Sequence, residues 1–353
     1  MKRLVLGINS SACGLILLLA GPFAWALNEP SHSVINQEAA IRSTLNAFLQ
    51  EHLGMPDGVR TPIRGPTESR RVEQWIQLGG IREDDGTGFE YLIGKSRPFR
   101  HFHDPLRLWD RSGLLLPPRI TRFESSIRWA QRKDQDQETG YGNYSWPHAR
   151  RYYLTALTDP DPRVRERAFT DTFRALGQVM HLIVDASVPE HVRNDPHPMG
   201  TILDKVGQVG NYEYWVLAQH RRTGTQPRFI QEFLSPPVTP HPNLLQYAPP
   251  VTETVARVPI AGLFDTDRYT GQNPWVTAEA DIGIAEIANA NFISENRGPR
   301  EYPHPALANV EKYIGTYSKT GEKRAYYVKP GVGLRVNPVA TECALEELTG
   351  VQT

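Results

Sequence analysis

Cysteine is almost absent from this sequence, and no motif for covalent catalysis takes its place. The 353 residues contain only Cys13 and Cys343. We expect Cys13 to be removed with the N-terminal segment, so that no internal disulfide can stabilise the fold. A Gly-x-Ser-x-Gly sequence, a Walker phosphate loop and a Cys-x-x-Cys pair are also missing. The sequence therefore gives no support to a serine hydrolase, a P-loop enzyme or a thiol enzyme.

An excess of charge of one sign is missing as well. The chain has 39 basic and 39 acidic residues, and loss of Lys2 and Arg3 with the first 26 residues leaves a formal charge of −2. A protein that binds a polyanion through many phosphate contacts needs a basic surface. We therefore expect no stable complex with nucleic acid.

The N-terminal residues have the composition of a signal peptide. A basic start at Met1–Arg3 precedes the apolar run GLILLLA, and AWA at 24–26 matches a small-x-small cleavage site. The apolar run is too short for a stable membrane anchor. We predict a signal peptide over 1–26 and a secreted or periplasmic protein without a transmembrane anchor. Its first residue would be Leu27; cleavage after Ala24, which would expose Trp25, is the alternative.

Strand-like alternation is scarce, whereas helical periodicity is common. Apolar residues at helical spacing predict helices over 33–53 and 69–78, ended by glycines at Gly54 and Gly79–Gly80. Two further helices begin at N-caps, Ser145 and Asp161, and Pro162 follows the second cap in the position that favours proline.

The longest predicted helix runs from Asp161 through His181 until Pro189 ends or bends it, and a core stripe follows Phe169, Phe173, Leu176, Met180 and Ile183. Residues 273–292 predict one more helix, and only 325–338 suggest a small β element near the C-terminus. With 29 prolines, we expect an all-α, multi-helix fold with long Pro-rich loops. One domain over 27–300 would precede a C-terminal extension over 301–353.

Three polar side chains interrupt the apolar end of the long predicted helix. His181 and Asp185 are four residues apart and share one helix face, and His191 follows just after Pro189. Burying such groups without partners costs several kcal/mol each, so we expect something to bind them. A core histidine bonded to an aspartate is the simpler alternative for the first two residues.

Matching groups occur elsewhere in the chain. The segment RHFHDP carries His101 and His103, IREDDG carries the acidic run 83–85, NYEYWV carries Glu213, and EPSH carries His32. Imidazole and carboxylate together are typical zinc ligands, and several carboxylates suggest more than one ion. Each acidic cluster alone is more often a surface loop, so the hypothesis depends on their combination.

These segments resemble the zinc-dependent phospholipase C family, whose fold is shared with the single-strand-specific zinc nucleases. The family pattern His-x3-Asp-x5-His, with a proline two residues before the last histidine, matches His181, Asp185, Pro189 and His191 without a gap. HFHDP, YEYWV and GGIREDD are similar to three further family segments. In the first, His103 stands where the family has a tyrosine.

The resemblance implies an exported zinc-dependent phosphodiester hydrolase that uses a metal-bound hydroxide and needs no protein nucleophile. It implies two or three zinc ions. One ion would be held by Asp84, His101, His181 and Asp185. Asp185 would also reach a second ion, bound by His32 and the backbone of Leu27, and a third ion would take His191 and Glu213. Asp84, with Asp85 as the alternative, would also orient or deprotonate the attacking water. The substrate would be a phospholipid or another phosphodiester, and the protein a monomer.

One position departs from the family pattern. Where the phospholipases have a histidine four residues before the glutamate, this chain has Val209. We predict that His197, six residues after His191, supplies the missing ligand. A single-strand nuclease of the same fold and a metal-stabilised binding protein without catalysis remain the alternative functions.

Overall fold

A computed structural model of the chain is mainly helical, as predicted from the sequence. The structure describes residues 29–86, 90, 94–116, 121–194, 260–271, 282–291, 311–316 and 323–328. The predicted signal peptide over 1–26 lies outside this range, as does the first part of the helix predicted over 273–292. Among the described residues, no helix has both the length and the apolar character that a membrane span requires.

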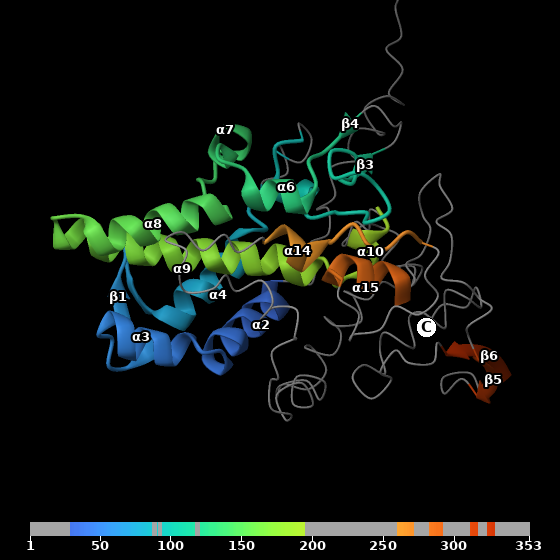
Figure 1. Cartoon of the computed structure of the whole chain (residues 1–353), viewed down its shortest axis with the longest axis horizontal. Coiled ribbons are helices and arrows are strands. Elements are labelled where there is room, and N and C mark those ends of the chain that lie inside the picture. The colour runs from blue at the N-terminus through green and yellow to red at the C-terminus, as the bar shows by residue number, and fades with distance from the viewer. Residues whose placement is uncertain are drawn as a thin grey trace, which may run out of the picture.

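The described elements are helices, of which α9 is the longest, and three small antiparallel strand pairs; β5 and β6 lie apart from α9 (Figure 1). The helices are α2 (Glu29–Arg42), α3 (Leu45–Leu53), α4 (Val72–Arg82), α6 (Ser126–Gln131), α7 (Gln135–Thr139), α8 (Trp146–Thr158), α9 (Pro162–Asp185), α10 (Pro189–Val192), α14 (Ala261–Phe264) and α15 (Ile284–Asn291), with 3₁₀ helices η1 (Gly58–Arg60) and η2 (Arg97–Arg100). The strands form antiparallel pairs: β1 (Pro62–Arg64) with β2 (Ser69–Arg71), β3 (Leu115–Leu116) with β4 (Thr121–Arg122), and β5 (Glu311–Thr316) with β6 (Lys323–Val328).

Helix α9 occupies the middle of the helical region, between α8 and α4 (Figure 1). Its start is confirmed as predicted, because the Asp161 side chain accepts a hydrogen bond from the backbone N–H of Arg163 at 2.8 Å and Pro162 is the first helical residue. Ser145 is likewise the N-cap of α8. These two local signals fix the starts of the two antiparallel helices.

Helices α4 and α9 approach closely at a pair of glycines. A Cβ on Gly79 would lie 2.1 Å from the carbonyl oxygen of Arg174, and one on Gly177 would lie 2.0 Å from that of Ile76. The predicted end of the helix at Gly79–Gly80 is wrong, since α4 continues to Arg82. These glycines serve backbone contact between helices and do not terminate the helix.

Two other helix limits differ from the prediction. The helix expected over 33–53 is divided into α2 and α3 at Ser43–Thr44, where the Ser43 hydroxyl accepts the N–H of Leu45 at 3.2 Å and replaces a helical hydrogen bond. Gly54 does end α3, in the left-handed conformation with φ 63°. Pro189 does not end α9: the helix stops one turn earlier, at Asp185, and Pro189 begins α10.

Two apolar clusters flank α9 and confirm its predicted core stripe. One joins α9 to α2, α3 and α4 and includes Phe173, Phe169, Leu176 and Met180; the other joins α9 to α6, α14 and α15 and includes Leu182, Ile183 and Phe264. The two clusters hold the end of α9 on both sides.

The predicted C-terminal β element is confirmed only in part. Residues 325–328 do lie in a strand, β6, but its partner β5 precedes it in the chain. The rest of the predicted segment, 329–338, lies outside the described residues.

Candidate metal centre

Five polar side chains meet at the C-terminal end of α9. His181 and Asp185 project from one face of α9; Asp84 comes just after α4, His101 just after η2, and His32 from the first turn of α2. Each of the five is at most 1% exposed. The helix spacing that predicted a shared face for His181 and Asp185 is therefore part of a larger, fully buried cluster.

Three atoms of this cluster, one each from His101, His181 and Asp185, are spaced closely enough to bind one metal ion, and Asp84 lies beside them. The carboxylate oxygen Asp185 Oδ2 lies 2.8 Å from His101 Nδ1 and 3.1 Å from His181 Nε2. The two ring nitrogens are 3.3 Å apart, and Asp84 Oδ1 lies 3.6 Å from each of them. Ligands about 2.0–2.1 Å from a tetrahedral zinc ion are about 3.3–3.4 Å from one another. The three separations among Asp185, His101 and His181 are near the edge length of such a tetrahedron, and Asp84 Oδ1 faces the two ring nitrogens from slightly farther away.

The ring of His181 is oriented by the backbone of α4. Its Nδ1–H donates to the carbonyl oxygen of Gly80 at 2.6 Å, so Nε2 is the nitrogen that faces the cluster. The close contact of α4 with α9 at Gly79 brings this carbonyl within reach. A hydrogen bond of this kind is typical of histidines that bind a metal.

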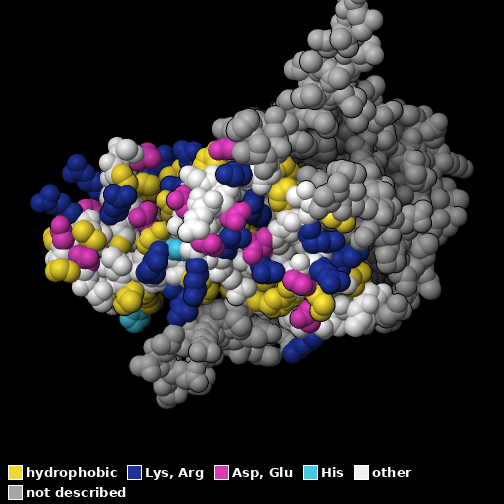
Figure 2. Space-filling model, turned by 90° about the horizontal axis from the view of Figure 1, so that it is seen from above, with side chains coloured by type: hydrophobic (Ala, Val, Ile, Leu, Met, Phe, Trp, Pro, Cys, Tyr) yellow, Lys and Arg dark blue, Asp and Glu magenta, His cyan; other side chains and the backbone are white. Residues whose placement is uncertain are grey.

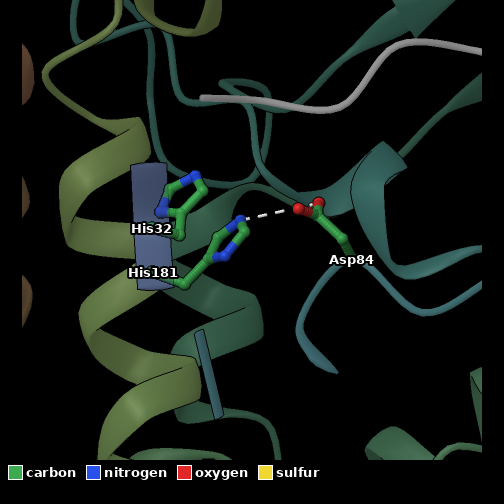
Figure 3. A group of neighbouring side chains, drawn as sticks. All are labelled: His32, Asp84 and His181. Atoms are coloured by element: carbon green, nitrogen blue, oxygen red, sulfur yellow. Dashed lines mark ion pairs between the residues drawn. The ribbon is translucent and has the colours of Figure 1, made fainter. Parts of the chain in front are cut away.

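The second oxygen of Asp185 extends the cluster towards α2. Asp185 Oδ1 lies 3.1 Å from His32 Nε2, and the His32 ring stacks on that of His181 with centroids 3.5 Å apart and an interplanar angle of 12°. Figure 3 shows these two rings side by side, with Asp84 facing His181. His32, Asp84 and His181 offer a second set of ligand atoms, all within 4.8 Å of one another. Asp185 thus contacts both sets, as a bridging carboxylate does.

His191 lies at the edge of the cluster, on α10. Its Nδ1 is 3.7 Å from Asp185 Oδ2 and 3.3 Å from the backbone carbonyl oxygen of His101, and its ring stacks on Phe102 at 4.4 Å. The turn from α9 into α10 brings it back towards the face that carries Asp185. The structure therefore brings together all three residues of the sequence motif.

The buried carboxylates of the cluster need a compensating positive charge. Burial raises the pKa of Asp185, but the histidines around it outweigh that effect and hold the pKa well below its usual range. Burial lowers the pKa of His181, but the charges of Asp185 and Asp84 outweigh it and raise the pKa to about 10. His101 is desolvated, and its pKa falls to about 3 in spite of Asp185. Two buried carboxylates therefore require positive charge from a proton or from a metal ion.

The oxygens of Asp185 also lack hydrogen bonds of good geometry. Neither oxygen accepts an aligned hydrogen bond from a described residue, although ring nitrogens lie 2.8–3.1 Å away. Contacts that are short but poorly aligned are expected when lone pairs converge on a common point and do not face one another. With these nitrogen and oxygen ligand types, the cluster could hold a metal ion.

Several predicted site residues lie outside this cluster. Asp85, the alternative to Asp84, is partly exposed and forms an ion pair with Arg82 at 3.2 Å. Leu27, His197, Val209 and Glu213 lie outside the described residues, so the predictions made for them stay predictions.

His103, two residues after His101, belongs to a separate buried network. Its Nε2 lies 2.8 Å from Asp265 Oδ2, which also accepts the indole N–H of Trp109 at 3.0 Å. Its Nδ1 contacts the Ser112 hydroxyl at 3.0 Å. Asp265 had no sequence signal, because it lies 162 positions after its partner.

Glu83 was not expected at the site either. The structure places its buried carboxylate between Arg97 and Trp129, with one oxygen 3.9 Å from His101 Nε2. In the sequence, its position directly before Asp84 was the one feature that pointed to a place at the site.

Comparison with known proteins adds no further information: no family model, no curated protein and no solved structure matches the chain. The functional assignment depends on the geometry of the cluster and on the motifs of the sequence.

Proposed function

We propose that this chain is an exported zinc-dependent phosphodiester hydrolase of the phospholipase C type. The observation that carries the proposal is the set of five separations, from 2.8 to 3.6 Å, among one atom each of Asp84, His101, His181 and Asp185. These are the four residues that the sequence resemblance groups around one ion. The resemblance also assigns His32 and Asp185 to a second ion, and these two side chains lie 3.1 Å apart.

The residues of the chain would hold and orient the ions. Bound zinc would supply Lewis acidity at the phosphate and an activated water for attack. Asp185 would bridge two sites through its two oxygens, while Gly80 keeps the His181 ring turned towards the cluster. Asp84 Oδ1 lies 3.6 Å from the ring nitrogens of both His101 and His181, and the family resemblance gives this residue the role of orienting a water. We assign it that role.

A lipid or small phosphodiester fits the charge of the protein better than a long nucleic acid does. On the face shown in Figure 2, basic, acidic and apolar side chains of the described residues are interspersed. The formal charge of the chain is zero. A single-strand nuclease remains the alternative within the same chemistry, since a short polyanion needs few phosphate contacts.

Burial of the ligands favours a second candidate, a metal-stabilised binding protein without catalysis. All five clustered side chains are at most 1% exposed, and structural zinc sites are closed whereas catalytic ones keep an open position. The same cluster would then hold zinc only to stabilise the fold.

One experiment separates these functions. Purified, zinc-loaded protein is tested on phosphatidylcholine, single-stranded DNA and a chromogenic phosphodiester, with His181→Ala as the control. Release of diacylglycerol that is lost in the control would support the phospholipase; DNA cleavage would favour the nuclease. Zinc binding with no turnover of any substrate would favour the binding protein, and absence of zinc would refute the metal centre.

A further inference from the structure

The last turn of α4 and the two residues directly after it, Glu83 and Asp84, lie beside both histidines of the first ligand set. The carbonyl oxygen of Gly80 accepts the Nδ1–H of His181, and Asp84 contributes its own carboxylate. Between these two positions lies Glu83, whose side chain is oriented towards His101. The end of α4 and the two residues after it thus contact His181 and His101 and supply the carboxylate of Asp84.

The ring of His101 has one nitrogen in the cluster and one behind it. Nδ1 lies 2.8 Å from Asp185 Oδ2. Nε2 is buried without a hydrogen-bond partner among the described residues, and Glu83 Oε1 lies 3.9 Å from it. A buried ring N–H without an acceptor is costly, and a histidine that binds a metal through one nitrogen usually donates from the other.

Glu83 is fixed where it can serve as that acceptor. Its Oε2 accepts a hydrogen bond from Arg97 Nη2 at 2.7 Å, and its Oε1 accepts one from the indole of Trp129 at 2.7 Å. Arg97 is held in turn by Gln178 at 2.8 Å and stacks over Trp129 at 5.0 Å. Because a carboxylate oxygen can accept two hydrogen bonds, Oε1 keeps one lone pair for His101.

We propose that Glu83 is a positioning residue of the metal centre: it accepts the Nε2–H of His101 when an ion binds, and so presents Nδ1 to that ion. The distance of 3.9 Å shortens by a small rotation of the imidazole as its Nδ1 moves onto the ion. The inference rests on the proposed metal centre, but not on hydrolysis.

Glu83→Gln tests this role, and Glu73→Gln is the matched control. Glu73 is a buried carboxylate at the opposite end of the same helix, paired with Arg71 at 2.6 Å. The dissociation constant of zinc is measured by competition with a chromophoric chelator, cobalt(II) absorption reports the ligand field, and thermal unfolding of the metal-free proteins reports stability. We expect Glu83→Gln to weaken zinc binding by about 10–100-fold and to change the cobalt spectrum. Glu73→Gln should lower only the stability.

Glu83→Asp keeps the charge opposite Arg97 but withdraws the carboxylate from His101, so it covers the case in which the glutamine variant fails to fold. It should also weaken zinc binding and shift the cobalt spectrum. Wild-type affinity and spectrum in either folded Glu83 variant would overturn the assignment and leave Glu83 a purely structural ion-pair partner. Absence of zinc from the wild-type protein would instead refute the metal centre itself, while zinc binding without turnover would refute only the hydrolase.

Discussion

In the part of the chain that the structure describes, two buried clusters of histidine and aspartate differ in how their polar atoms are satisfied. In the cluster of His103 and Asp265, the carboxylate accepts the indole N–H of Trp109 and the backbone N–H of Asp267, and both ring nitrogens of His103 have partners. In the cluster of His101, His181 and Asp185, the carboxylate lies close to ring nitrogens, and neither carboxylate oxygen has an aligned hydrogen bond among the described residues.

This difference separates a structural network from a cluster of the same residue types that could hold a metal ion. A closed network stabilises the fold because each buried donor has an acceptor. A buried carboxylate whose oxygens have no aligned hydrogen bond is left incompletely satisfied, and a bound ion would satisfy it. The distinguishing feature is thus the set of neighbours around each carboxylate, and not the residue types themselves.

The largest expected effect comes from the same substitution made in each cluster. Asp185→Asn removes a charge that contacts every ligand histidine, so we expect zinc affinity to fall by more than the roughly 10–100-fold cost of losing a group that only orients a ligand. Asp265→Asn should keep full zinc affinity and lower the free energy of unfolding of the metal-free protein by about 1–3 kcal/mol. Zinc competition and urea unfolding measure the two quantities. Equal loss of zinc in both variants would show that the two clusters do not differ in the way proposed.

A smaller effect is expected where α4 and α9 touch. Gly79→Ala places a methyl group 2.1 Å from the Arg174 carbonyl oxygen, which should lower stability by about 1–3 kcal/mol and displace Gly80 from His181. Zinc binding should weaken as well. Gly140→Ala is the control, since its φ of 74° is unfavourable for alanine but a Cβ there meets nothing within 4 Å. If Gly140→Ala weakens zinc binding as much as Gly79→Ala, the effect reflects general stability and not the position of α4.

The smallest effect is expected at Asp85, the neighbour of Asp84. Asp84 lies in the buried cluster, whereas Asp85 forms a partly exposed ion pair with Arg82 that is worth about 0–1 kcal/mol. Asp84→Asn should weaken zinc binding, and Asp85→Asn should leave both zinc binding and stability nearly unchanged. If the same chelator competition shows that Asp85→Asn weakens zinc binding and Asp84→Asn does not, then Asp85 and not Asp84 is the ligand.

The parts of this structure that depend on local signals were predictable from the sequence. The N-caps Ser145 and Asp161, the stop at Gly54 and the shared face of His181 and Asp185 all follow from residues within a few positions of one another. These signals concern the backbone of a single segment.

Features that depend on long-range contacts were not predictable. Gly79 and Gly80 suggested a helix end. The sequence alone does not distinguish a glycine that allows two helices to touch from a glycine that ends a helix. The pairing of His103 with Asp265 and the contact of Glu83 with His101 join segments whose approach no local pattern encodes. The metal cluster was anticipated only through its motif on α9 and through the resemblance of the other segments.

The central claim is that the cluster at the end of α9 binds zinc, and native mass spectrometry of the purified protein tests it most directly. We predict at least one zinc ion per chain in the wild-type protein and in Asp265→Asn, lost from Asp185→Asn and from wild-type protein treated with a chelator. Thermal unfolding of the same samples should show the wild-type melting temperature falling on chelation, by an amount set by the zinc affinity. The account would be contradicted if the wild-type protein bound no zinc when the ion is in excess and if the chelator left its melting temperature unchanged.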